Sequence, residues 1–359
     1  MAPLVQAFKA DPRFETRVCV TAQHREMLDQ VLEFFDITPE YDLDLMKPGQ
    51  NLYGLTAAII TNLQPVLEEF KPDYVYVHGD TTTTMAGSIA AFYSGAQVCH
   101  VEAGLRTHNK RSPFPEEVNR NITGRIADYH FAPTTTSQHN LLNEGVAQAD
   151  ILVTGNTVID ALLESAKRVD GHFQNAEITK LKNLVVADRR VILVTGHRRE
   201  NHGQGFENIC AALGQLAQDN PQVDIIYPVH LNPKVLEPVH RLLGNHTNVH
   251  LIEPLGYPAF VWLMNKSYLI ITDSGGVQEE APSLGKPVLV MRDTTERPEA
   301  VDAGTVLLVG TDVEKITSHA QRLLDHDVEY KNMSQQHNPY GDGQACERIV
   351  NFIADLDEQ

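Results

Sequence analysis

Short apolar segments alternate with segments of helical periodicity along the whole chain. In the first half the apolar segments cover residues 17–22, 74–78, 97–101, 129–132 and 151–154. In the second half they cover residues 190–195, 223–229, 249–252, 268–272, 287–291 and 305–309. Most of these segments are apolar on both faces, which is typical of strands that are buried on both sides by helices.

The segments between the predicted strands have one apolar face each, as expected for helices that pack on a sheet. The longest apolar stripe is formed by Leu52, Leu55, Ile59, Leu63, Val66, Leu67 and Phe70. Alternating strands and helices in both halves predict an α/β fold with two doubly wound, Rossmann-like domains. A chain of 359 residues is long enough to bury two cores of this kind.

The polar segment 165–189 lacks a strong strand signal, so the junction between the domains is expected there. We expect an N-terminal domain of residues 1–165, completed by a C-terminal helix within 342–359, and a C-terminal domain of residues 166–341. Residues 1–10 have a helical pattern. The strand that usually opens such a domain, and usually lies at its centre, is therefore expected to be missing.

Composition narrows the class of protein and its location. The formal net charge is −18, which disfavours binding to nucleic acid or to an anionic membrane. Cys19, Cys99, Cys210 and Cys346 form no C-x-x-C pair, which indicates reduced thiols in a cytoplasmic protein. No apolar stretch approaches the ~20 residues of a membrane span, and the N-terminus lacks the features of a signal peptide. A phosphate ligand must therefore be held by a few local donors.

Polar and charged residues follow the carboxyl ends of the predicted strands, where doubly wound domains bind their ligands. The segments concerned are 78–84, 102–106, 196–201, 229–233 and 273–276. Residues that only solvated the surface would be scattered, so we interpret these segments as parts of a functional site.

The Asp-Ser-Gly-Gly-Val-Gln-Glu-Glu motif gives the clearest chemical signal. Gly275 and Gly276 allow a ligand to approach the backbone, and the free N–H groups at a helix start favour a phosphate. Ser274 adds a hydroxyl donor, Glu280 can accept hydrogen bonds from a ribose, and Arg297 can pair with a diphosphate. The alternatives are a serine-capped helix with a tight turn and, for Arg297, a surface salt bridge.

Three carboxylates, Asp80, Glu102 and Glu116, lie near the strand ends of the first domain. His197 and Arg198 follow the first strand of the second domain. Facing each other across a cleft, the two groups would supply proton transfer from one side and phosphate donors from the other. Taken singly, each carboxylate is also compatible with a helix cap or a solvated charge.

The sequence predicts neither a catalytic metal nor a nicotinamide cofactor. It contains no H-E-x-x-H motif, and His100-Val-Glu102 has no Pro-Cys-x-x-Cys partner of the kind found in zinc deaminases. The Gly203-Gln-Gly205 and Gly341-Asp-Gly343 pairs do not complete a G-x-G-x-x-G motif after a strand. We therefore expect an enzyme that works without a cofactor.

Five motifs and the ending of the chain together resemble the non-hydrolysing UDP-N-acetylglucosamine 2-epimerases of bacteria. They are His78-Gly-Asp-Thr-Thr-Thr-Thr84, Val101-Glu-Ala-Gly-Leu-Arg106, Thr195-Gly-His-Arg-Arg-Glu200, Thr272-Asp-Ser-Gly-Gly-Val-Gln-Glu-Glu280, Arg292-Asp-Thr-Thr-Glu-Arg-Pro-Glu-Ala300 and Asn338-Pro-Tyr-Gly-Asp-Gly-Gln-Ala345. They occur in order over nearly the whole chain, and their combination is highly specific.

The resemblance implies two glycosyltransferase-B-like domains with a cleft between them, in a homodimer. It implies the interconversion of UDP-GlcNAc and UDP-ManNAc, and a supply of ManNAc for cell-surface polysaccharide. It implies catalytic positions at Asp80, Glu102, Glu116 and His197. It implies nucleotide-binding positions at Ser274, Gly275, Gly276, Glu280 and Arg297, with the uracil near Leu255 and Phe260. A second, activating UDP-GlcNAc would be bound by Gln23, His24, Arg25, Arg198 and His230.

One departure from the family pattern lies at the start of the sequence. Members of the family open with a strand and a Gly-Thr-Arg-Pro-Glu loop whose arginine contacts the substrate. This sequence begins just past that point, so we expect weakened folding or activity for the chain as written.

The chemistry of the sugar limits the possible mechanisms. C2 is not next to a carbonyl, so its proton is a very weak acid. Elimination avoids this problem: UDP leaves C1 while a carboxylate removes the C2 proton, giving 2-acetamidoglucal, and UDP then adds back with protonation on the other face. Asp80, Glu102 and Glu116 are all candidates for base and acid. The alternatives are a hydrolysing epimerase that releases ManNAc, a glycosyltransferase of the same fold and an inactive nucleotide-sugar sensor.

Overall fold

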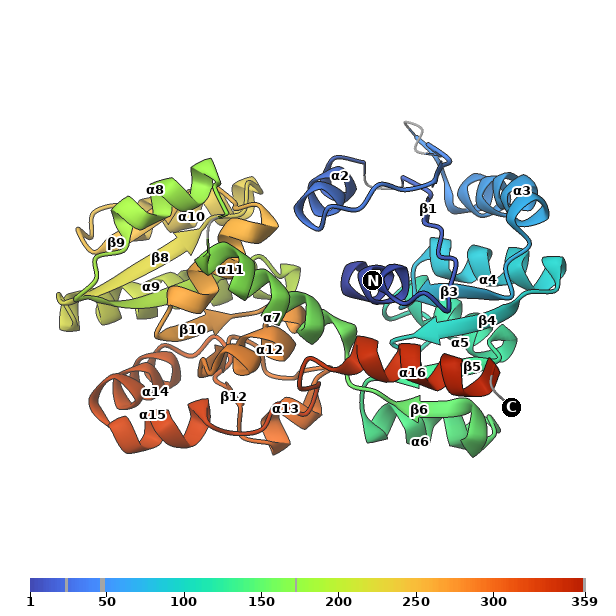
Figure 1. Cartoon of the computed structure of the whole chain (residues 1–359). Coiled ribbons are helices and arrows are strands. Elements are labelled where there is room, and N and C mark those ends of the chain that lie inside the picture. Colours follow the sequence, from blue (N-terminus) through green and yellow to red (C-terminus); the bar gives the residue numbers. More distant parts are fainter. Residues whose placement is uncertain (23–24, 46–48, 172, 358–359) are drawn as a thin grey trace. The chain divides into compact units, whose positions relative to one another are not determined.

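The computed structural model describes residues 1–22, 25–45, 49–171 and 173–357. The chain forms two compact units, each built on a parallel sheet with helices (Figure 1). Unit 1 contains Met1–Ala161 and Tyr340–Gln359, and unit 2 contains Leu162–Pro339. The predicted α/β fold with two domains of parallel strands is therefore confirmed. One helix, α7 (Thr157–Asp170), crosses the boundary between the units.

Unit 1 has a main sheet in which four strands lie side by side in chain order, all parallel. These strands are β3 (Tyr74–His78), β4 (Gln97–Val101), β5 (Tyr129–Ala132) and β6 (Ile151–Val153). A separate parallel pair contains β1 (Cys19–Val20) and β2 (Tyr41–Asp42). The helices of unit 1, besides the first part of α7, are α1 (Ala2–Ala10), α2 (Arg25–Phe34), α3 (Leu52–Phe70), α4 (Thr82–Ser94), α5 (Glu116–Ile126), α6 (Thr135–Asn143), the 3-10 helix η1 (Gln148–Asp150) and α16 (Ala345–Asp357).

Helices from opposite ends of the chain share one core in unit 1. Leu4 and Phe8 of α1 are buried together with Ile349 and Ile353 of α16. Asp160 of α7 accepts hydrogen bonds from the first two N–H groups of α16, at 3.3 and 2.9 Å. A carboxylate at this position stabilises the start of a helix. The C-terminal segment is therefore an integral part of unit 1.

Unit 2 has a parallel sheet in the order β12-β11-β10-β7-β8-β9. Its strands are β7 (Arg190–Thr195), β8 (Val223–Pro228), β9 (Val249–Ile252), β10 (Leu269–Thr272), β11 (Val288–Val290) and β12 (Val306–Leu308). Its helices, besides the end of α7, are α8 (Ala176–Leu184), η2 (Arg199–Asn201), α9 (Gln204–Asp219), α10 (Pro233–Leu243), α11 (Tyr257–Lys266), α12 (Gly275–Glu280), η3 (Ala281–Leu284), α13 (Pro298–Asp302), α14 (Val313–Asp325) and α15 (Asp327–Ser334).

The strand order of unit 2 reverses between β7 and β10. From β7 the chain adds β8 and β9 on one side of the sheet, then β10, β11 and β12 on the other. Thr195 and Thr272 are register partners at the ends of the two central strands. Ligands in sheets of this kind bind beyond the carboxyl ends of the strands at the point of reversal. The loops after Thr195 and Thr272 therefore lie where a ligand is expected.

Two buried histidines are neighbours inside the sheet of unit 1. His100 and His130 are register partners on β4 and β5, and their exposed fractions are 0% and 1%. Burial lowers the pKa of both imidazoles, that of His130 to about 4. Both residues are thus neutral in the fold and take up a proton on unfolding. The stability that depends on their neutral forms is complete above about pH 6.5 and is lost as the pH falls.

We predict that His130→Leu makes the protein less sensitive to acid. Between about pH 7.5 and about pH 5, the free energy of unfolding should fall by about 2 kcal/mol more in the wild type than in this variant. The reason is that the unfolded His130 becomes protonated in this range, while a pKa of about 4 keeps the folded residue neutral. Denaturant unfolding followed by circular dichroism measures the difference. His139→Leu, at an exposed position of α6, is the control. An equal pH dependence of wild type and H130L would contradict the prediction.

Candidate active site

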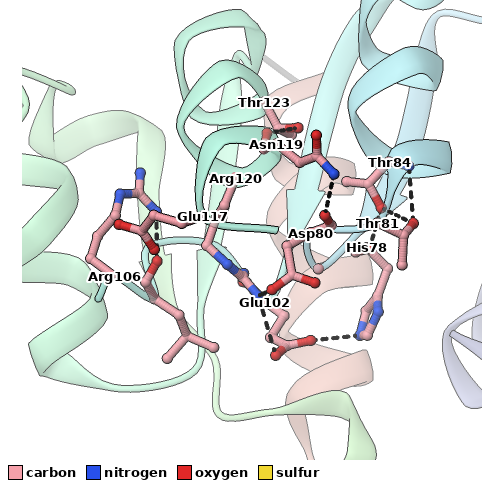
Figure 2. Close-up of polar contacts among 12 residues, drawn as sticks. His78, Asp80, Thr81, Thr84, Glu102, Arg106, Glu117, Asn119, Arg120 and Thr123 are labelled. Carbon is pink, nitrogen blue, oxygen red and sulfur yellow. Dashed lines mark hydrogen bonds and ion pairs between the residues drawn. The ribbon is translucent and has the colours of Figure 1, made fainter. Parts of the chain in front are cut away.

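A cluster of charged side chains lies at the carboxyl ends of β3 and β4 in unit 1 (Figure 2). His78, the last residue of β3, pairs in register with Val101, the last residue of β4. The carboxylates that follow the two strands, Asp80 and Glu102, therefore emerge at the same level of the sheet. They belong to the motifs that the sequence singled out after each strand.

The turns that carry these carboxylates have left-handed backbone conformations. The angle φ is +68° at Gly79 and +62° at Glu102. Glycine adopts this conformation freely, whereas for a glutamate it is unfavourable by about 1 kcal/mol. His100 Nε2 lies 2.8 Å from the Gly79 carbonyl oxygen and holds the first turn in place. A non-glycine residue kept in this conformation at a strand end is typical of a functional position.

One buried arginine, Arg120 of α5, joins the two carboxylates. It donates hydrogen bonds to the carboxylate of Asp80 and to the backbone oxygen of Glu102. Its Nη2 also lies 3.7 Å from Glu102 Oε1, and its side chain is only 5% exposed. Asn119 supports the same turn by donating to the Asp80 backbone oxygen at 2.9 Å. The sequence did not identify Arg120 as a site residue, although it follows Glu116 by four residues on one helix face.

His78 completes the cluster as a neutral group. Its Nε2 lies 3.5 Å from Glu102 Oε2. Burial, the positive amino terminus and Arg120 lower the pKa of His78 to about 3. The contact with Glu102 is therefore a contact of a neutral imidazole with a carboxylate and not an ion pair.

Glu116, the third predicted carboxylate, lies in the first turn of α5 and is partly exposed. Its Oε2 is buried, and no donor within the described ranges reaches that oxygen. The structure thus joins Asp80 and Glu102 through Arg120, while Glu116 enters no hydrogen bond with either of them. Its neighbour Glu117 has a different task, because it accepts hydrogen bonds from the backbone N–H groups of residues 107 and 108 and fixes that loop.

Unit 2 carries a second polar cluster, at the point where its strand order reverses. His197 and Arg198 follow β7, and Asp273 and Ser274 follow β10. Asp273 is fully buried, and its Oδ2 accepts hydrogen bonds from the backbone N–H groups of His197 at 3.0 Å and Arg198 at 2.8 Å. One carboxylate therefore connects the two loops.

Two arginines approach the first turn of α12. A Cβ atom placed on Gly275 would lie 3.7 Å from Arg198 Nη2 and 3.9 Å from Arg297 Cζ. Arg297 also donates from Nε to the carboxylate of the buried Glu279. Within the described residues, the Ser274 hydroxyl makes no capping bond to α12. The guanidinium groups, the hydroxyl and the backbone N–H groups form a donor set that suits a diphosphate.

Arg198 lies beside residues that were predicted to bind the nucleotide. The resemblance implied that Arg198 binds a second, activating ligand, whereas Ser274, Gly275 and Arg297 bind the nucleotide. In unit 2 all four residues lie together. Gly276, the next residue of α12, is exposed and leaves the end of the helix open to a ligand.

Glu280, predicted to bind a ribose, is the last residue of α12 and is partly exposed. Burial and the neighbouring negative charge of Glu279 raise the pKa of Glu280 to about 7. Near neutral pH, this carboxyl group is therefore protonated in about half of the molecules. A ligand that donates hydrogen bonds to it would favour the charged form.

The residues predicted at the uracil position lie in one turn of unit 2. Leu255 precedes α11 and Phe260 belongs to its first turns, where the Phe260 N–H donates to the Gly256 oxygen at 3.0 Å. Both side chains are partly buried. This turn follows β9, at the same edge of the sheet as the ends of β7 and β10.

The predicted second binding site is described only in part. His230 follows β8, and its ring stacks on that of His197 with centroids 5.1 Å apart and an angle of 10° between the planes. Gln23 and His24 lie outside the described residues, and Arg25 is the first residue of α2.

The described residues contain no group of three or more His, Cys, Asp or Glu side chains that could hold a metal ion. In the same residues no helix is both long and apolar enough to span a membrane.

Comparison with known proteins gives a consistent result. The family model of UDP-N-acetylglucosamine 2-epimerase matches residues 6–354. The UDP-N-acetylglucosamine 2-epimerase of Salmonella typhimurium is 60% identical over 354 residues, covering 98% of this chain and 94% of the relative. The crystal structure of UDP-GlcNAc 2-epimerase from Neisseria meningitidis bound to UDP-GlcNAc is 50% identical with a TM-score of 0.88, covering 99% of this chain and 96% of that chain. The S. aureus MnaA–UDP co-structure is 49% identical with a TM-score of 0.84, covering 100% and 93%.

We predict that Arg120→Leu destabilises unit 1 by about 2–3 kcal/mol, because it removes the cation between two partly buried carboxylates. Denaturant unfolding measures this loss. Asp80→Asn in the R120L background should recover part of it, since one unpaired charge disappears. Arg125→Leu, at an exposed position of the same helix, is the control and should stay within about 0.5 kcal/mol of the wild type. Equal losses in R120L and R125L would show that Arg120 does not hold the cluster.

Proposed function

We propose, starting from the fact that this chain belongs to the UDP-N-acetylglucosamine 2-epimerase family, that it reversibly epimerises UDP-GlcNAc at C2 to UDP-ManNAc without net hydrolysis. Two similar structures support the choice of ligands, since one protein is bound to UDP-GlcNAc and the other to UDP. The observation that carries the proposal is the pair of carboxylates, Asp80 and Glu102, held around Arg120 at the ends of two parallel strands.

The reaction proceeds by elimination and re-addition. A carboxylate removes the C2 proton while the C1–O bond to UDP breaks, and a double bond forms between C1 and C2. The intermediate is 2-acetamidoglucal. Protonation of C2 on the other face and re-attack of UDP at C1 give the epimer. Carboxylates on both faces of the sugar are required, and Asp80, Glu102 and Glu116 are the residues to which we assign these roles.

Unit 2 retains UDP between the two half-reactions. Arg198 and Arg297 neutralise the diphosphate beside Gly275, Ser274 donates from its hydroxyl, and the backbone N–H groups of α12 add further donors. His197 follows β7 at the same edge and stabilises the charge of the leaving group. Leu255 and Phe260 contact the uracil. Without this retention the glycal would escape, and the products would be the glycal and free UDP.

We also propose a cellular location, an assembly and a biological role for the enzyme. The enzyme acts in the cytoplasm as a homodimer and supplies ManNAc units for cell-surface polysaccharide. A second UDP-GlcNAc activates it through Gln23, His24, Arg25, Arg198 and His230, and Arg198 is then shared between this ligand and the diphosphate of the substrate. These statements rest on membership of the family and on the motifs of this sequence.

Epimerisation in deuterium oxide tests the mechanism. We expect deuterium at C2 of both UDP-GlcNAc and UDP-ManNAc at equilibrium, because the proton removed by a carboxylate exchanges with solvent. Mass spectrometry and proton NMR measure its incorporation. Retention of the original hydrogen at C2 would exclude the elimination route. Release of free ManNAc in step with turnover would identify a hydrolysing enzyme instead.

The pKa of Glu280 predicts how nucleotide affinity depends on pH. If ribose hydroxyls donate to the charged carboxylate, UDP should bind the wild type about five- to tenfold more tightly at about pH 8 than at about pH 6, relative to Glu280→Gln. The sign follows from a pKa of about 7, since raising the pH ionises Glu280. Isothermal titration calorimetry at both pH values gives the ratio, in which the ionisation of UDP itself cancels. Glu314→Gln, at an exposed position of α14, is the control. Parallel pH profiles of wild type and E280Q would refute a contact with the ribose.

A further inference from the structure

The two carboxylate oxygens of Asp273 differ in their hydrogen bonding. Oδ2 accepts hydrogen bonds from the backbone N–H groups of His197 and Arg198, at 3.0 and 2.8 Å, and from Asn201 Nδ2 at 3.3 Å. Oδ1 is buried, and no donor in the described part of the chain reaches it. Asp273 as a whole is 0% exposed. A buried oxygen without a donor is unfavourable by about 1–3 kcal/mol, so its presence in the fold needs a reason.

The imidazole of His197 is a group that can supply a donor to this oxygen. His197 Nδ1 lies 4.0 Å from Asp273 Oδ1, about 1 Å beyond hydrogen-bond distance. The backbone of His197 is fixed by Oδ2 of the same carboxylate and by Tyr227, whose hydroxyl donates to the Gly196 oxygen at 2.8 Å. The His197 side chain is 51% exposed, so rotation about its own bonds can close the gap.

The neighbouring imidazole of His230 constrains His197 from the other side. Its Nδ1 accepts a hydrogen bond from the Asn232 N–H at 3.0 Å. His230 in this arrangement is therefore neutral, with its proton on Nε2. A neutral ring stacked on His197 does not repel a positive charge there, which two facing imidazolium rings would do.

We propose that Asp273 is a positioning residue for His197: in the nucleotide complex Nδ1–H of His197 donates to Asp273 Oδ1, and Nε2 is directed at the departing diphosphate. This inference rests on the proposed function, because it assigns the orientation of a residue at that site. A carboxylate behind Nδ1 fixes the tautomer and stabilises a positive charge on the ring. Nε2–H can then donate to the phosphate oxygen on which negative charge develops.

Aspartate is the residue that this task requires. Two backbone N–H groups point at the Oδ2 position, so an asparagine would have to place its amide oxygen there. Its NH₂ group would then occupy the Oδ1 position and donate toward His197 Nδ1. Asp273→Asn thus keeps the hydrogen bonds that hold the loop but forces the proton of a neutral His197 onto Nε2. A purely structural role of Asp273 does not predict this change.

The tautomer of His197 is measured by ¹⁵N NMR of protein labelled at histidine, with UDP as the ligand. The signal is assigned by its loss in His197→Gln. The wild type with UDP should show Nδ1 protonated, and D273N should show Nδ1 unprotonated. UDP affinity of D273N should change less than about threefold, while kcat of epimerisation falls by about 100-fold.

Asp224→Asn is the matched control, because Asp224 is also buried, pairs with Arg189 and lies 3.1 Å from His250 Nε2. It should leave the His197 signal and kcat unchanged. An unprotonated Nδ1 in the wild-type complex overturns the proposal, and so does a D273N variant that keeps Nδ1–H and kcat. Failure to bind UDP also overturns it. A protonated Nδ1 that depends on Asp273, in a protein without epimerase activity, supports this inference and refutes the proposed function.

Discussion

All strands of the two main sheets pair in parallel, so the carboxyl ends of each sheet lie along one edge. This constraint decides which residues can act together. In unit 1 it places Asp80 and Glu102 at the same level of the sheet edge, although they are 22 residues apart in the sequence. In unit 2 it brings the His197 loop to the Asp273 segment across the reversal of strand order. Parallel strands need long crossover connections, which usually contain a helix, and burial of the apolar strands offsets the cost of these connections in both units.

Each cluster contains charged groups that are partly removed from water, and the central buried charge is positive in unit 1 and negative in unit 2. In unit 1 two carboxylates surround one buried cation, Arg120. In unit 2 buried carboxylates, Asp273 and Glu279, hold the loops and side chains that present donors to an anion. Charges that are partly removed from water need a partner, and each cluster supplies it within its own unit. The net charge of −18 is compatible with anion binding, because the hydrogen-bond donors for the anion are gathered locally in unit 2.

Features encoded locally could be predicted from the sequence, whereas partners that depend on register could not. The strand ends and the glycine-rich turn at Gly275 follow from apolar runs and turn chemistry, and both lie where they were expected. Arg120 could not be predicted, because the sequence of a helix does not indicate which strand ends its side chains will contact. The unused oxygen of Asp273 depends on the pairing of β10 with β7. The segment 17–22 looked like a full strand, but only Cys19–Val20 pairs with another strand in the described structure. A short run of apolar residues cannot by itself specify the extent of pairing.

The arginines that suit a diphosphate already have negative partners. Arg297 contacts Glu279, and Arg198 Nη1 lies 3.9 Å from Glu296. An entering diphosphate therefore competes with these carboxylates and does not meet unpaired cations. If Arg297 turned fully to the phosphate, Glu279 would stay buried beside Glu280, and two adjacent carboxylates would repel each other. The raised pKa of Glu280 reflects its burial first and this repulsion second. In the proposed complex, hydrogen bonds from the ribose to Glu280 would offset this repulsion, so binding of the ribose and binding of the diphosphate would be coupled through this pair of glutamates. In the proposed mechanism, the same competition would limit how tightly UDP is held, and a limited affinity is what an enzyme needs if UDP must both return to C1 and leave with the product.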